Sequence, residues 1–318
     1  MNPKMKSNPA TENLTRGQRI LFAVLWSLCS LTARMPVWYR YYLLKPLILS
    51  LMFLMRYRRK VILQNLQRSF PERSHKEHCR IMRRYYGILA EVIVDTISLT
   101  RARPDNGFPY IRFRNTEEHI AQLGEQDWIA MASHYGCWEY LPMWSWFDPT
   151  LTFMGVYHPL TSPLFEAFYR RLRAFSPNIE QIRMKECVRY YLRNRKQGDR
   201  HYLIGLIADQ NPGRRPDSHW FSFLNQDTVF FDGAEKLALR FSLPVFFVHM
   251  ERQKPGRYEA WFEMIYDGKE QVEEGEITRR YALRLEQMIC RKPELWMWSH
   301  RRWKSKHREE DLPVMPLS

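Results

Sequence analysis

The sequence has few cysteines, and none of them lie close together. The five are odd in number, widely scattered and form no CxxC pair, which argues against a disulfide framework and against a structural zinc site. They are Cys29, Cys79, Cys137, Cys187 and Cys290. This usage of cysteine fits a reducing compartment.

Nucleotide-binding signatures and metal-ligand clusters are also missing. Neither GxGxxG nor GxxxxGK[ST] occurs, and no spacing of ligating side chains suggests a metal site. The chain shows no internal repeat and no low-complexity segment. We therefore expect neither a cofactor nor a metal.

Acidic residues are scarce relative to basic ones. Asp and Glu total 34 against 49 Lys and Arg, giving a net charge of +15. Such a surplus suits an anionic partner, which can be nucleic acid, an acidic membrane, or an acidic protein or ligand. A nucleic-acid-binding protein would show steep salt-dependent binding, but no nucleic-acid motif is present. With 45% hydrophobic residues in 318, the chain can bury a sizeable core.

No apolar run is long enough to span a bilayer comfortably, since a spanning helix needs about 20 residues. The uncharged run Ile20–Ala33 resembles a signal peptide but lacks a small-x-small cleavage site. A second run, Pro46–Met55, stops at the basic cluster Arg56–Lys60, and aromatic residues flank both runs. Bilayer interfaces select aromatic residues and basic flanks.

We therefore predict that residues 20–55 anchor the protein to a membrane, spanning it once or lying in its interface. The alternative is a buried core hairpin. On this prediction residues 1–60 form the anchor and its basic flank, and residues 61–318 form the second domain.

The rest of the chain alternates short apolar runs with helical patterns. This alternation predicts an α/β fold with a mostly parallel central sheet flanked by helices. "RYEAWFEMI" is expected to pair antiparallel with the last strand at an edge of the sheet, and Ser74-x-x-Glu77 to cap a long helix. The predicted strands are Trp128–Ser133, Leu151–Tyr157, His201–Ala208 and Leu243–Met250, and the predicted helices are Tyr140–Phe147, Pro163–Phe175, Lys185–Arg195, Gly233–Phe241 and Ile277–Arg291.

The stretch "DWIAMASHYGCWEY" places His134 after a predicted strand and Glu139 five residues later. Positions five apart are roughly 140° apart on a helix, so the two cannot form an HExxH-type pair. They could meet if His134 lies in a turn allowed by Gly136 and Glu139 lies in the first turn of the next helix. A carboxylate bonded to one ring nitrogen would leave the other free to take a proton. The alternative is a pair of unrelated surface residues.

"SHYGCWE" resembles the HxxxxE/D motif of the lysophospholipid acyltransferase superfamily. The chain as a whole is similar to the branch that performs late acylation of lipid A, the lauroyl and myristoyl acyltransferases. The resemblance extends from the membrane segment to about residue 304. The segments that carry it are "RYRRKVILQNLQRSFPE", "VYHPLTSPLFEAFYRRLRA", "LIADQNPG", "FFDGAEKLALRFSLPVFFVHMER" and "PELWMWSHRRWK".

This resemblance implies a glycerol-phosphate acyltransferase-like fold over residues 61–318. It also implies an acyltransferase of the EC 2.3.1 type. The donor would be an acyl carrier protein thioester and the acceptor a hydroxyl of a lipid A precursor at the cytoplasmic face of the bacterial inner membrane. Departures at Ser133, His158 and Ser162 leave a lysophospholipid or an aminolipid as alternative acceptors. A scaffold that kept the fold and lost catalysis is a third hypothesis.

The resemblance also implies roles for individual residues. His134 would be the general base, and Glu139 would orient it and stabilise the imidazolium. Arg171 and Arg173 would hold an acidic group of the substrate; the alternative is a solvated basic helix face. Asp209 and Gln210 would complete the substrate site, with Asp209 pairing with an arginine; the alternative for Asp209 is a capping role before Pro212.

Two further features have competing interpretations. Cys137 could form a covalent acyl intermediate, but a thiol in such a position is usually buried and inert. The tail "WMWSHRRWKSKHR" could contact anionic headgroups or acyl carrier protein, or it could pack on the sheet through its tryptophans.

Overall fold

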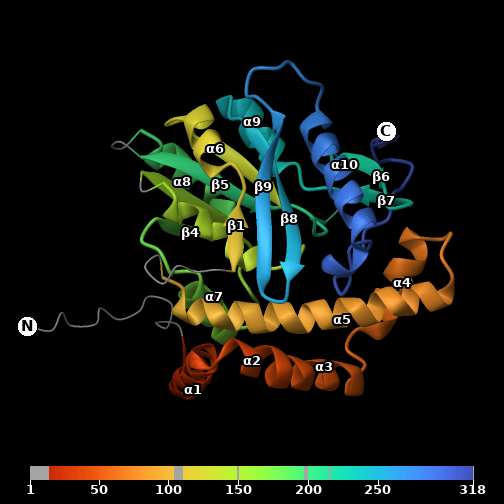
Figure 1. Ribbon diagram of the computed structural model, residues 1–318. Coiled ribbons are helices and arrows are strands. Elements are labelled where there is room, and N and C mark those ends of the chain that lie inside the picture. The colour runs from red at the N-terminus through yellow and green to blue at the C-terminus, as the bar shows by residue number, and fades with distance from the viewer. Residues whose placement is uncertain are drawn as a thin grey trace, which may run out of the picture.

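The computed structural model describes residues 14–103, 110–148, 150–196, 200–213, 215 and 217–317. Within these residues the centre of the molecule is a seven-stranded sheet in the order β1-β9-β8-β2-β5-β3-β4 (Figure 1). The strands are β1 (Ile111–Phe113), β2 (Trp128–Ala132), β3 (Leu151–Tyr157), β4 (Ile179–Arg183), β5 (His201–Ile207), β6 (Trp220–Phe223), β7 (Gln226–Val229), β8 (Val245–Lys254), β9 (Arg257–Tyr266) and β10 (Val314–Met315).

Strands β8, β2, β5, β3 and β4 run parallel, whereas β9 is antiparallel to β8 and β1 is parallel to β9. The predicted α/β fold with a mostly parallel sheet is therefore confirmed. The predicted hairpin is also present, because β8 and β9 pair over their whole length and turn at Gly256 with a φ of 67°. The prediction that this strand forms an edge of the sheet is wrong, because β1 pairs with the outer side of β9. A second sheet, in the order β10-β6-β7, was not predicted.

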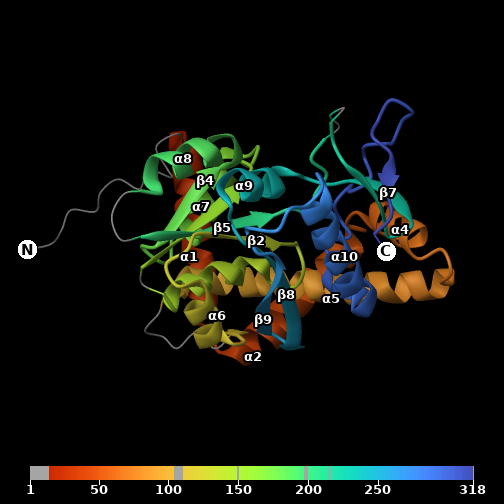
Figure 2. The same ribbon diagram turned by 90° about the horizontal axis from the view of Figure 1, so that it is seen from above.

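The helices lie on both sides of the sheet. Seen from above, α8 and α9 lie on one side of the sheet and α5 and α6 on the other (Figure 2). The α-helices are α1 (Arg16–Arg34), α2 (Val37–Tyr39), α3 (Lys45–Leu54), α4 (Arg59–Ser69), α5 (His75–Ser98), α6 (Thr116–Leu123), α7 (Pro163–Leu172), α8 (Cys187–Asn194), α9 (Gly233–Phe241) and α10 (Glu276–Arg291). Short 3-10 helices are η3 (Leu99–Arg101), η5 (Trp138–Trp146), η6 (Met184–Glu186) and η7 (Pro293–Leu295), and η2 (Arg40–Leu44) is a π-helical turn.

Local sequence explains where helix α5 begins and why η5 is a 3-10 helix. Ser74 accepts a hydrogen bond from the backbone of Glu77, and the Glu77 carboxylate bonds back to the Ser74 N–H, so the predicted capping box starts α5. The predicted helix Tyr140–Phe147 is instead the 3-10 helix η5, which contains Pro142. Proline lacks the N–H that an α-helical bond would need and its ring clashes with the preceding turn.

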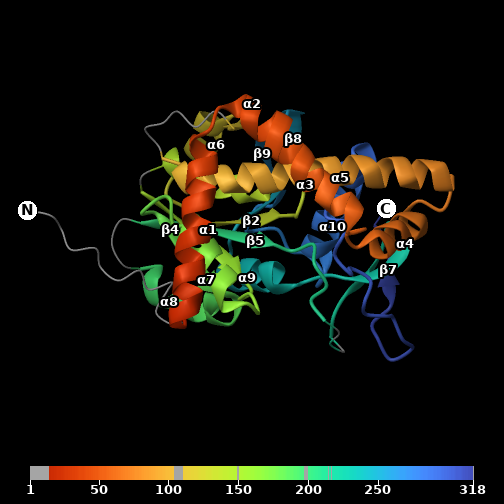
Figure 3. The same cartoon turned by 90° about the horizontal axis from the view of Figure 1, so that it is seen from below.

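The N-terminal helices form an outer layer beneath α5 (Figures 1 and 3). Among the described residues no single helix is long and apolar enough to cross a membrane. Helix α1 and the helical stretch 37–54 meet the length and hydropathy requirement together, but they are bent by 119°. Residues 1–13 of the predicted anchor lie outside the described residues.

Large apolar side chains on these helices are exposed, which is inconsistent with a buried core hairpin. They include Ile20, Leu21, Val24, Leu28, Leu31, Trp38, Tyr42, Leu43, Leu47, Leu51, Phe53, Leu54 and Met55. The inner side of the layer is held to α5 by polar contacts. Tyr41 donates to the buried carboxylate of Asp95, and Lys45 lies 2.5 Å from the buried carboxylate of Glu91.

Candidate active site

Sheet register brings His134 and Asp209 together. Strands β2 and β5 are parallel neighbours, with Ala132 paired to Ile207, so the residues two positions beyond each pair lie opposite one another. His134 Nδ1 lies 2.7 Å from Asp209 Oδ1, and the backbone N–H of His134 donates to Oδ2 at 2.9 Å. Ligands of open α/β sheets bind at these carboxyl ends of the strands.

Asp209 is held as a buried carboxylate. It is 2% exposed and accepts a third hydrogen bond, from Trp296 Nε1 at 2.8 Å. Burial raises the pKa of the Asp209 carboxyl, but the charge of His134 and the hydrogen bonds from His134 and Trp296 outweigh burial and leave that pKa below its ordinary value. The ionised carboxylate accepts from Nδ1–H, so the proton of the neutral imidazole is on Nδ1 and Nε2 carries the lone pair.

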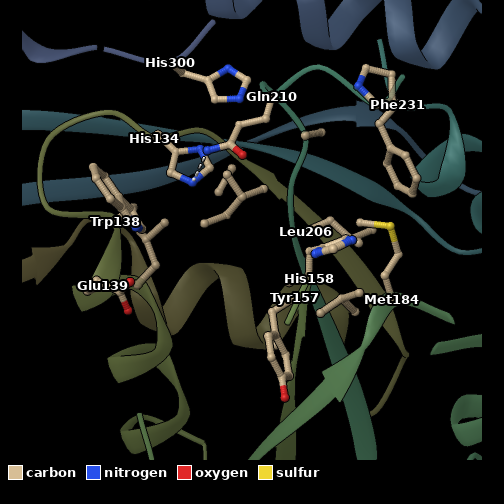
Figure 4. A pocket seen from close by; sticks show the side chains of 18 of the residues that line it. His134, Trp138, Glu139, Tyr157, His158, Met184, Leu206, Gln210, Phe231 and His300 are labelled. Carbon is tan, nitrogen blue, oxygen red and sulfur yellow. Dashed lines mark hydrogen bonds between the residues drawn. The ribbon is translucent and has the colours of Figure 1, made fainter. Parts of the chain in front are cut away.

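The free nitrogen of His134 faces Gln210. Gln210 Nε2 lies 3.1 Å from His134 Nε2, and the amide donates to the ring (Figure 4). His300 lies beyond Gln210, and the Trp138 ring packs edge-on against the imidazole with centroids 4.9 Å apart. A substrate group can therefore take the place of the Gln210 amide at Nε2, whereas Nδ1 is held by the Asp209 carboxylate.

The expected bond between Glu139 and His134 is not formed. Glu139 lies on the far side of Trp138 in Figure 4 and makes a bidentate ion pair with Arg173, at 2.8 Å from Nε and 2.5 Å from Nη2. Burial raises the pKa of the Glu139 carboxyl, but the charge and hydrogen bonds of Arg173, and more weakly the charge of His134, hold that pKa below its usual range. Glu139 thus acts on His134 only at longer range, and Asp209 holds the ring.

The two predicted arginines point in different directions. Side chains two positions apart in sequence point roughly 200° apart around a helix axis. Only one of Arg171 and Arg173 can therefore face the sheet. Arg173 faces Glu139, whereas Arg171 stacks over the Trp26 ring of α1 at 4.1 Å and does not line the cavity described below. The expectation that Arg171 holds substrate is not supported by this placement.

The loop between β2 and η5 is shaped by Gly136. Its φ is 59°, and a Cβ at this position would lie 2.8 Å from Met250 Sδ, so the predicted tight turn is present. The N–H of Gly136 donates to the carbonyl of Leu295 at 3.0 Å, so it is not free to donate to a substrate oxygen. Cys137 is fully buried, and burial raises the pKa of its thiol well above the ordinary value, which leaves it protonated and unreactive.

A cavity of about 1460 Å³ opens beside His134. One face of the sheet forms its apolar wall, to which β2, β3, β5, β8 and β9 contribute. Glu139, Arg173 and Gln210 also line it, whereas Asp209 lies behind His134. Figure 4 shows Tyr157, His158 and Met184 on the side of the cavity away from His134.

The rim of the cavity carries cations. Arg58, Arg301 and Lys304 line it and are exposed, and we call them the cationic rim. Arg58 Nη1 donates to the carbonyl of Ser299 at 3.0 Å. Within the described part of the chain, none of the three is paired with a carboxylate.

The C-terminal tail has the packing role that was one of its two predicted alternatives. Trp296, Trp298 and Trp303 are buried, so the tail packs through its tryptophans as one alternative predicted. Trp296 also supports Asp209, and no local sequence signal could reveal this because the two are 87 positions apart. Over the described ranges, no group of three or more His, Cys, Asp or Glu side chains is placed to hold a metal ion.

A comparison with protein families identifies one match over most of the chain. The family model described as bacterial lipid A biosynthesis acyltransferase matches residues 9–305. A search of curated proteins found no match.

Proposed function

Because the chain belongs to the bacterial lipid A biosynthesis acyltransferase family and is therefore an acyltransferase, we propose its donor, acceptor and catalytic base. The donor is an acyl carrier protein thioester, the acceptor is a hydroxyl of a lipid A precursor, and His134 is the general base. The observation that carries this proposal is the His134–Asp209 pair at the edge of a large cavity with an apolar wall.

The geometry supports base catalysis by Nε2. The acceptor hydroxyl displaces the Gln210 amide and gives its proton to Nε2 while its oxygen attacks the thioester carbonyl carbon. The tetrahedral intermediate then loses the thiolate as the C–S bond breaks, and the imidazolium returns the proton to the sulfur. A base of this kind contributes about 100- to 10,000-fold to the rate.

Two carboxylates support the imidazolium in different ways. Asp209 contacts Nδ1–H directly and fixes the tautomer. Glu139 makes no contact with the ring but adds negative charge near it, in a rigid pair with Arg173. On this proposal Asp209 is the positioning residue, and Glu139 and Arg173 form a charged wall of the substrate site.

The cationic rim suits an anionic acceptor. Guanidinium groups bind phosphate bidentately, and lipid A precursors carry phosphates and acidic sugars. Arg58, which lines the cavity, has a φ of 45°, in the left-handed region that non-glycine residues adopt only at a conformational cost. A lysophospholipid or an aminolipid has fewer anionic groups than a lipid A precursor and would leave part of the cationic rim unpaired.

The N-terminal layer suits an interfacial anchor. Its outer side carries exposed Leu, Ile, Trp and Tyr side chains, and Arg56–Lys60 follow at its end. On this proposal residues 1–60 bind the cytoplasmic face of the inner membrane in its plane, and residues 61–318 form the catalytic domain. Arg58 is then close to the lipid headgroups.

The experiment offers purified enzyme a labelled acyl chain on acyl carrier protein, with a lipid A precursor, a lysophospholipid or an aminolipid as acceptor. Mass spectrometry should find a new ester on the lipid A precursor alone. Transfer only to a lysophospholipid or an aminolipid would overturn the acceptor. Transfer from a coenzyme A thioester but not from the carrier protein would overturn the donor.

A further inference from the structure

The apolar wall of the cavity is arranged in rows by sheet register. Gly205 of β5 pairs with Ala130 of β2 on one side and with Gly155 of β3 on the other. These three small residues form one row across the sheet, and all of them line the cavity. Because side chains alternate along a strand, residues two positions away belong to the next row on the same face.

The next row away from His134 is formed by large side chains. It contains Trp128, Leu203 and Phe153, which pair in the same register. Successive rows are roughly 6.6 Å apart, since each residue of a strand advances about 3.3 Å. Small side chains therefore leave open space over the sheet near His134, and large side chains fill that space one row further from it.

The ring of Phe153 leans out of its own row over the two glycines. Its Cζ lies 2.7 Å from the position that a Cβ on Gly205 would take, and its Cε1 lies 3.3 Å from the corresponding position on Gly155. Real Cβ atoms essentially never lie as close as 2.7 Å to a non-bonded heavy atom, so a Cβ on Gly205 would clash with the ring. A side chain on Gly155 would make a tight contact with the same ring.

The Phe153 ring lies outside the neighbouring cluster of aromatic side chains. Phe262, which lines the cavity, packs in a cluster of ring contacts with Trp128, Trp144 and Phe246. In the described part of the molecule Phe153 makes no ring–ring contact of this kind, and it is 7% exposed.

We propose that Phe153 is the end stop of the acyl-chain channel and sets the longest fatty acyl chain that the enzyme transfers. This inference rests on the proposed function, because it requires an acyl donor in the cavity. A chain that enters past His134 runs along the row of Ala130, Gly205 and Gly155 and meets the Phe153 ring. Each methylene accommodated there adds about a fourfold preference, since its burial is worth about 0.8 kcal/mol.

The test is a competition between acyl carrier proteins that carry saturated chains of increasing length, with products read by mass spectrometry. Phe153→Leu and Phe153→Ala should shift the preferred chain to greater length, with the larger shift for alanine. Each newly accepted methylene should raise kcat/KM about fourfold relative to the natural chain. Met154→Leu is the matched control, because Met154 is the next residue of β3, is fully buried and does not line the cavity.

A second variant tests the contact with the glycine. Gly205→Ala places a methyl group against the Phe153 ring and should displace the ring into the channel, which shifts the preference to shorter chains. The double variant Gly205→Ala/Phe153→Ala should recover the longer chains.

If folded Phe153→Ala keeps the natural length distribution, Phe153 is not the end stop. If the natural enzyme transfers no chain of any length to the lipid A precursor, the proposed function fails instead. The two failures are therefore distinguishable.

Discussion

The carboxylate of Asp209 bonds to His134 twice, once through the ring at 2.7 Å from Nδ1 and once through the backbone N–H at 2.9 Å. The ring contact fixes the tautomer, and the backbone contact fixes the loop from which the ring projects. Both contacts depend on the parallel register of β2 and β5, so the geometry of the base is set by the core of the sheet.

Replacing Asp209 by asparagine should lower kcat about 100- to 10,000-fold with little change in KM, because the imidazolium loses its counter-charge. Three donors would also compete for one acceptor oxygen. Steady-state kinetics with acyl carrier protein thioester and lipid A precursor measure this.

The matched control for that variant is Asp148→Asn. Asp148 pairs with His201 Nε2 at 2.9 Å, at the opposite end of β5. This variant should lose stability and keep kcat. Equal losses of kcat in both variants would show that Asp209 acts only through folding.

Breaking the Glu139–Arg173 pair should act mainly on stability. Glu139→Gln removes the counter-ion of the Arg173 guanidinium, whose side chain is 27% exposed, and should cost about 1.5–3 kcal/mol of unfolding free energy. Adding Arg173→Met should recover part of that loss. Chemical denaturation of the two single variants and the double variant measures the coupling.

The kcat of folded Glu139→Gln should fall less than the kcat of Asp209→Asn, because Asp209 and not Glu139 contacts the imidazole. A larger fall in the Glu139 variant would identify Glu139 as the main partner of the base.

The sequence predicted both ends of the site but not their pairing. His134 and Asp209 were each expected at the end of a strand, yet 75 positions separate them. The strand order β2-β5 decides that they meet, and periodicity does not reveal strand order. Glu139, only five positions away, was the natural candidate, but Gly136 and the 3-10 helix η5 turn it towards α7.

Helix geometry could have separated the two arginines. Positions two apart on a helix face nearly opposite directions, so helix geometry argues against the shared role of Arg171 and Arg173 that the family resemblance implied. It could not say which one faces inward, because this depends on α1 covering α7 through Trp26. The Phe153 ring over Gly155 and Gly205 likewise follows from register and not from any motif.

Acid should weaken the fold through His119. The imidazole packs among Trp128, Trp144, Phe246 and Phe262, and burial lowers the pKa of His119 from 6.5 to about 4. Between these two values the unfolded chain binds the extra proton, so stability is complete above about pH 6.5 and falls as the pH drops towards 4. The loss is about 3 kcal/mol at most.

His119→Phe should reduce this pH dependence, as measured by denaturation at neutral pH and near pH 4.5. His75→Phe, on the exposed side of α5, is the control and should leave the dependence as it is. An unchanged slope in His119→Phe would mean that other groups cause the acid sensitivity.

Exposed leucines of the N-terminal layer should carry membrane binding. The triple variant replaces Leu28, Leu47 and Leu54 by glutamine. Burial of each leucine is worth about 1.5–3 kcal/mol, so partitioning to vesicles containing anionic phospholipid should fall at least about tenfold, which corresponds to 1.4 kcal/mol. Co-sedimentation measures the bound fraction.

The control for the vesicle experiment substitutes exposed leucines outside this layer. These are Leu192, Leu239 and Leu312. Equal losses of binding in the two triple variants would contradict an anchor in the N-terminal helices.

The most direct test of the account is the single-turnover rate of acyl transfer from acyl carrier protein to a lipid A precursor by the natural enzyme and by His134→Ala. The rate of the His134→Ala enzyme should be lower by at least about 100-fold, with folding and vesicle binding retained. A His134→Ala enzyme that transfers the chain at the natural rate would contradict the assignment of this imidazole as the base.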